Sequence, residues 1–141
     1  MANIEGKIYK EIVTNYGFTK KAVDNISKAL KDECGQEELT EDNAQKVFDC
    51  IIEDLDGNIQ DDYDSYRQGT HETNIKPDYS RHYESKSVAS QMEDGTWIGW
   101  TYWYGGGKHS NPEELAWIET AYELTVVEEE VKVIKRTFTK V

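Results

Sequence analysis

Apolar residues recur every three or four positions along the first part of the chain, which is the spacing of amphipathic helices. The first expected helix covers residues 3–16 and stops before Gly17. The second begins after Thr19 and the third after Thr40, because threonine is a good N-cap residue, and Gly57 closes the third. The apolar stripes are Ile4, Ile8, Ile12 and Val13, then Ala22, Val23, Ile26, Ala29 and Leu30, then Ala44, Val47, Phe48, Ile51, Ile52 and Leu55. Each helix therefore has one face to bury.

A polar connector with Gly69 and Pro77 separates these helices from a region of different periodicity. Its first part, residues 60–66, is expected to form one more helical turn. Residues 82–91 and 96–104 then flank a turn signal at positions 93–95 and predict a β-hairpin.

A second group of predicted elements follows the hairpin. Asn111 and Pro112 form a strong helix start, and the short helix carries Leu115, Trp117 and Ile118. Segments 122–127 and 131–138, rich in β-branched and aromatic residues, predict a second hairpin. The expected fold is therefore α+β, with three N-terminal helices packed on an antiparallel sheet of about four strands and one short inserted helix. It forms a single domain, 1–141, with a helical part (1–57), a connector (58–80) and a ββαββ part (81–141).

The strand at 96–104 carries large aromatic side chains on both faces. Alternation places Trp97, Gly99, Thr101 and Trp103 on one face and Ile98, Trp100, Tyr102 and Tyr104 on the other. We expect a central strand covered on both faces, because monomers rarely expose large apolar patches. The alternative is a stacking platform for a base or nucleotide.

The net charge of −12 comes from one window of the chain. Between Asp32 and Asp64 there are thirteen acidic residues and a single basic one, Lys46. Such a window disfavours DNA binding in this region, since affinity for a phosphate backbone needs Lys and Arg. It suits a basic partner, a cation or solubility alone. The candidate partner-binding residues are Glu37, Glu38, Glu41, Asp42, Glu53, Asp54 and Asp56.

The glycine-rich loop after the aromatic strand is the candidate ligand site. It leads into a helix N-terminus, where free backbone N–H groups and a lysine attract anions. The phosphate-loop match is poor, because Tyr102 stands where that motif needs glycine and His109 where it needs serine or threonine. The competing interpretation is a flexible strand-to-helix connection. The candidate residues are Trp103, Tyr104, Gly105, Gly106, Gly107, Lys108, His109 and Ser110.

No cofactor, metal or catalytic set is expected. Cys34 and Cys50 lack the spacing of a zinc site, and residues 53–59 resemble only the middle of a calcium loop. Neither a leader pattern nor a run of eighteen apolar residues is present, so we expect a cytoplasmic protein with reduced thiols and no membrane association.

The stretches Arg81–Ala89, Trp97–His109 and Pro112–Glu114 resemble a family of small uncharacterised proteins carried by bacteriophages and prophages. The resemblance covers roughly residues 80–140 and implies a phage setting inside a bacterial cell, without implying an activity. The favoured hypothesis is a non-enzymatic binding protein, such as a counter-defence or host-modulating factor. It would engage a host or phage protein through the acidic helices or the aromatic strand. The alternatives are a nucleotide or anion binder at Gly105–Ser110 and an enzyme whose polar residues converge only after folding. The sequence leaves the oligomeric state open.

Overall fold

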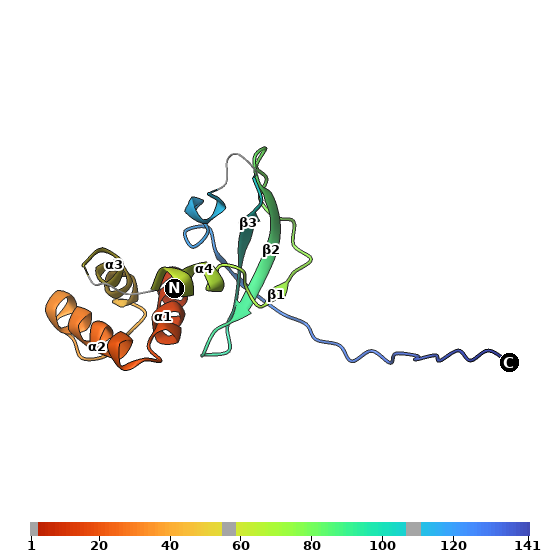
Figure 1. Ribbon diagram of the computed structural model, residues 1–141, viewed down its shortest axis with the longest axis horizontal. Coiled ribbons are helices and arrows are strands. Elements are labelled where there is room, and N and C mark those ends of the chain that lie inside the picture. Colours follow the sequence, from red (N-terminus) through yellow and green to blue (C-terminus); the bar gives the residue numbers. More distant parts are fainter. Residues whose placement is uncertain (1–2, 55–58, 107–110) are drawn as a thin grey trace.

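The fold is α+β, with helices gathered on one side of an antiparallel sheet (Figure 1). The computed structural model describes residues 3–54, 59–106 and 111–141, without the side chain of Asp54. The helices are α1 (Ile4–Tyr16), α2 (Lys20–Ala29), α3 (Ala44–Asp54) and α4 (Ile59–Tyr66), with a π-helical turn η1 (Leu30–Cys34) and a 3₁₀ turn η3 (Pro112–Glu114). The strands are β1 (His71–Glu72), β2 (Glu84–Gln91), β3 (Trp97–Tyr104) and β4 (Tyr122–Leu124), in the order β1-β2-β3-β4.

The helix starts follow the capping residues. Asn3 caps α1 by accepting from the Gly6 amide at 3.0 Å, and Thr19 caps α2 as predicted. The third helix starts later than predicted, at Ala44. Residues 41–43 form a turn, although Thr40 and Asn43 bond each other's backbone amides through their side chains, the exchange typical of a helix start. Its predicted end at Gly57 lies outside the described residues.

The predicted helical turn at 60–66 and the first hairpin are confirmed. The turn is α4, and β2 pairs with β3 over eight residues, from Glu84 opposite Tyr104 to Gln91 opposite Trp97. The predicted short helix at Asn111 is only the three-residue turn η3, so Trp117 and Ile118 lie beyond it in non-helical chain.

The predicted second hairpin is wrong. Only β4 forms, and residues 125–141 run away from the body as extended chain without strand pairing to any described residue (Figure 1). The sequence offers a physical reason. A return strand would have to turn at Glu128–Glu130, where three like charges are adjacent and no glycine or asparagine supplies the backbone angles of a tight turn.

β3 is an inner strand, as predicted, and its helix-facing side joins the core. Trp100 is fully buried there, and its indole N–H donates to the carbonyl oxygen of Arg67 at 2.8 Å. On the opposite face, called the back face below, Thr101 and Trp103 are also buried. The connector covers part of that face, since the amide of Asp78 donates to Thr101 Oγ1 at 3.2 Å.

A continuous chain of aromatic rings joins the helices to the sheet. The ring centroids lie 5.0–5.7 Å apart along the series Tyr9, Phe48, Tyr63, Trp117, Trp100 and Tyr66. Trp117 donates its indole N–H to the Tyr63 hydroxyl at 2.9 Å. Since these rings come from α1, α3, α4, β3 and the segment after η3, the helical part and the sheet share one core.

Candidate functional site

The candidate ligand loop begins where β3 ends. Trp103 is only 9% exposed, so its ring offers no open face, whereas Tyr104 is half-buried. Gly105 and Gly106 follow with φ angles of 72° and 95°. A side chain at Gly106 would meet the Tyr83 ring at 2.7 Å, so the close approach there requires glycine. The remaining candidates, Gly107, Lys108, His109 and Ser110, lie outside the described residues.

Two cations and two tyrosines gather beside this loop on the helix-facing side of the sheet. We call Arg67, Lys86, Tyr102 and Tyr104 the cation–tyrosine cluster. The hairpin register places Lys86 opposite Tyr102. The two tyrosine rings stack, with centroids 5.5 Å apart and planes 18° apart. Lys86 Nζ lies 5.7 and 5.9 Å from the two ring centroids, within cation–π range.

Arg67 is the unusual member of the cluster because its guanidinium is buried, with only 8% of the residue exposed. Nη1 donates to the carbonyl oxygen of Trp103 at 2.6 Å, and the guanidinium carbon lies 4.9 Å from the Tyr102 ring centroid. Nε has no hydrogen-bond partner among the described residues, and none of their carboxylates forms an ion pair with Arg67. A buried charge without a counter-charge is costly, and a guanidinium matches carboxylate and phosphate geometry.

The candidate partner-binding acids do not form one cluster. Glu37, Glu38, Glu41 and Asp42 precede α3, whereas Glu53 lies near its far end, and all but the half-buried Glu41 are exposed. A helix rises about 1.5 Å per residue, so the part of α3 from Ala44 to Glu53 alone puts roughly 14 Å along the axis between the two groups. The side chain of Asp54 and all of Asp56 lie outside the described residues.

The ion pair between α1 and the β2–β3 turn is structural. Lys7 Nζ lies 2.7 Å from Asp94 Oδ2. The hydrogen bond from Lys7, followed by those from Thr96, holds the pKa of Asp94 well below its usual range, and the same bond raises the pKa of Lys7. The amide of Glu93 also donates to Glu11 Oε1 at 2.8 Å, so two polar contacts fasten α1 to this turn.

A groove lined by both apolar and polar residues lies on the back face, between the β1 end of the connector and the start of the segment after β4. Its volume is about 530 Å³. Trp97 forms part of its wall, with the His71 ring edge-on at 5.2 Å. The other apolar residues along it are Ile75, Ala89, Leu124, Val126 and Val127, and the other polar ones are Glu72, Thr73, Asn74, Thr125 and Glu128. This groove is separate from the cation–tyrosine cluster, which occupies the opposite face.

The described residues contain no group of three His, Cys, Asp or Glu side chains that could hold a metal ion. His71 is exposed and contacts Thr70 Oγ1 through Nδ1 at 2.9 Å, and the half-buried Cys34 is a free thiol. Over the same described part of the chain, every helix is too short or too polar to span a bilayer.

Sequence reasoning missed two members of the cluster. Lys86 could have been found, because a turn at 93–95 pairs it with Tyr102 on one face. For Arg67 no local signal exists, since its position depends on how α4 packs against β3. No protein family, curated protein or solved structure matches this chain.

Proposed function

We propose that this chain is a non-enzymatic binding protein that recognises an anionic, ring-bearing ligand, such as a nucleotide, at the cation–tyrosine cluster. The observation that carries the proposal is Arg67, a buried guanidinium that has a carbonyl and a ring as neighbours but no carboxylate among the described residues. An anion would supply the missing charge.

The tyrosines supply the second half of the recognition. Tyr104 is half-buried at the end of the stacked pair, so one more planar ring can extend the stack beside it. Lys86 lies within reach of both tyrosine rings and would add a second positive charge for a phosphate or carboxylate. This combination favours a ring with an attached anion over either group alone.

The acidic residues support a partner protein less well, because they lie at two ends of α3 and are largely solvated. A host or phage protein as partner, the phage setting and the cytoplasmic location stay predictions from the sequence. A catalytic role has less support. The hydroxyl–imidazole contact of Thr70 with His71 joins adjacent exposed residues, and Thr70 Oγ1 donates to the carbonyl oxygen of Ala89 at 3.1 Å.

A thermal-shift titration tests the proposal. Ligand at about 100 times its Kd stabilises a protein by about 2.7 kcal/mol, which corresponds to a rise in Tm of roughly 8 °C for a chain of this size. We expect nucleotides to give such a rise and inorganic phosphate a smaller one. Lys86→Gln and Tyr104→Ala should abolish it, whereas Lys46→Gln, an exposed lysine on α3, should leave it unchanged. The absence of a shift with every nucleotide, or an equal shift in Lys86→Gln, would contradict the proposal.

A further inference from the structure

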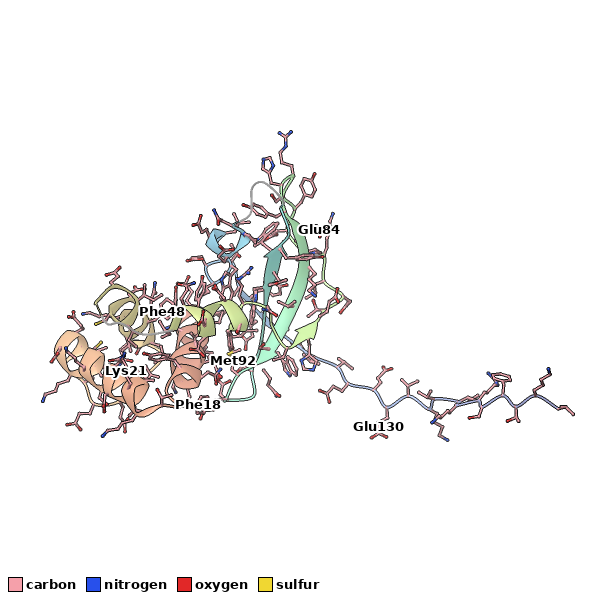
Figure 2. The ribbon with its side chains drawn as sticks, in the orientation of Figure 1. Phe18, Lys21, Phe48, Glu84, Met92 and Glu130 are labelled. Atoms are coloured by element: carbon pink, nitrogen blue, oxygen red, sulfur yellow. The ribbon has the colours of Figure 1, made fainter. Side chains whose placement is uncertain are left out.

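The segment after β4 exposes apolar side chains that a folded protein normally buries. Val131, Val133, Ile134 and Phe138 are 76%, 84%, 74% and 87% exposed. The segment leads away from the body in extended form, and Glu130 on it lies far from the helices (Figure 2). These residues have high β-propensity, and an unpaired extended segment of this kind is a template for strand addition.

The segment is also divided by charge. Its first half holds three adjacent acids, Glu128–Glu130. The second half holds four cations and no acid, the cations being Lys132, Lys135, Arg136 and Lys140. When two such segments run antiparallel, the acidic half of each lies against the basic half of the other. The charge pattern therefore favours a second copy of this chain as the partner.

Symmetry limits the possible registers. In a two-fold antiparallel pair the axis is perpendicular to the ladder, so the same residue of each copy lies on the same face. Directly opposite residues also share a face, which means that their two numbers must both be odd or both be even. A symmetric ladder must consequently be centred on one residue facing its own copy.

We propose that residues 124–140 of two copies form an antiparallel ladder centred on Lys132, which makes the protein a symmetric dimer. This register pairs Glu128 with Arg136 and Glu129 with Lys135, in both directions. It also places Val126 opposite Phe138 and Val131 opposite Val133. The two Lys132 side chains face each other, with Glu130 of each copy diagonal to them.

Neighbouring registers lose these pairings. Centring on Val131 keeps one ion pair per copy, Glu130 with Lys132, and places Glu128 opposite Ile134. Centring on Val133 also keeps one, Glu130 with Arg136, and places Val131 opposite Lys135. Centring on Glu130 keeps one ion pair per copy and brings two Glu130 together. The Lys132 register is the one among these with two ion pairs per copy.

The back-face groove supports the same register independently. Leu124 is paired with Trp97, and a side chain at Gly99 would meet Leu124, so Leu124 projects on the back face. Alternation continues this face through Val126, which lines the groove. The register places Phe138 of the second copy directly across from Val126. That ring can then cover the groove, which lies on the face opposite to the cation–tyrosine cluster.

Sedimentation equilibrium on the full chain tests the dimer with a charge-swap design. Glu128→Arg/Glu129→Lys and Lys135→Glu/Arg136→Glu each set like charges opposite in a homodimer, and each should weaken dimerisation about 100-fold. An equimolar mixture of the two variants has every pair complementary and should dimerise as the parent does. The chain carrying all four substitutions should regain the homodimer.

Two further variants complete the design. Phe138→Asp should also weaken the dimer, because it places a carboxylate opposite Val126 in a groove that Glu72 and Glu128 also line. Lys20→Glu/Lys21→Glu changes the net charge as much as Lys135→Glu/Arg136→Glu but lies on α2, so it should leave the dimer intact. A monomeric parent at about 100 μM, well above the Kd expected of a specific dimer, overturns the proposal. A dimer that the charge swaps leave unchanged, or that the mixture fails to restore, overturns it as well.

Discussion

Replacement of Trp100 by alanine is the most informative perturbation of the core. The side chain is fully buried, stacks 5.7 Å from Tyr66 and lies 5.0 Å from Trp117. Truncation of a buried tryptophan costs roughly 3–5 kcal/mol through lost burial and the cavity left behind. The variant also removes the donor to the buried Arg67 carbonyl, which adds about 1 kcal/mol. The expected loss of roughly 4–6 kcal/mol is a large part of the total stability of about 5–15 kcal/mol typical of a domain.

Urea denaturation followed by far-ultraviolet circular dichroism measures this loss without relying on tryptophan emission. With an m-value of about 2 kcal/mol/M, the midpoint should fall by roughly 2–3 M. Trp100→Phe keeps an aromatic ring but not the N–H, so its urea midpoint should lie between those of the parent and Trp100→Ala. Tyr79→Ala is the control, since Tyr79 is 87% exposed, and should move the midpoint by less than about 0.3 M. If Trp100→Ala shifts the midpoint by less than about 0.3 M, Trp100 is not part of the core.

Three further predictions concern packing, ionisation and backbone geometry. Trp103→Ala should lower the free energy of unfolding by roughly 3–5 kcal/mol, because Trp103 is only 9% exposed on the back face. A urea midpoint equal to the parent's would mark Trp103 as a surface residue. Stability should fall as the pH rises above 10, since burial raises the pKa of Tyr66 above its ordinary 10.0. The folded state keeps a proton that the unfolded state releases, so this contribution is complete below pH 10 and lost above it. Urea titrations at about pH 8 and about pH 11 should show a smaller decline for Tyr66→Phe, and an identical decline would count against this assignment. Gly69→Ala should lower Tm more than Gly35→Ala, although φ is positive at both positions. A Cβ at Gly69 would lie 2.7 Å from Val88, whereas a Cβ at Gly35 would have nothing within 4 Å. Equal drops in Tm would show that the contact with Val88 is relieved at no cost.

Local signals were sufficient for α1, for the start of α2, for α4 and for the first hairpin. Thr19 caps its helix through a bond between residues three apart, and the turn at 93–95 sets all eight pairs of β2 and β3. Alternation also assigned the two faces of β3, so the burial of Trp100 and Trp103 followed from the pattern. These features depend on neighbours in sequence or on one turn.

Features that depend on contacts between distant residues could not be predicted from the sequence. Asn43 bonds Gln36 and Glu38 in addition to Thr40, and this network ties the start of α3 to residues that precede it by five and seven positions. Segment 131–138 has the composition of a strand but no partner strand within the described chain, so propensity alone predicted a hairpin that does not form. Arg67 enters the candidate site only because α4 packs against β3.

The polar clamp between α1 and the β2–β3 turn has a consequence for synthesis on the ribosome. Glu11 and Glu93 are 82 residues apart, so at about 5–20 residues per second the turn emerges roughly 4–16 s after α1. α3 emerges sooner and contacts α1, which shelters one side of the helix during the wait. α4 also contacts α1 and emerges before the hairpin, so the surface of α1 around Lys7 and Glu11 is what stays accessible to chaperones until the hairpin arrives. Docking of α1 on the hairpin is thus a late event in the synthesis of the chain. A ribosome stalled within the connector would hold the helices without the sheet.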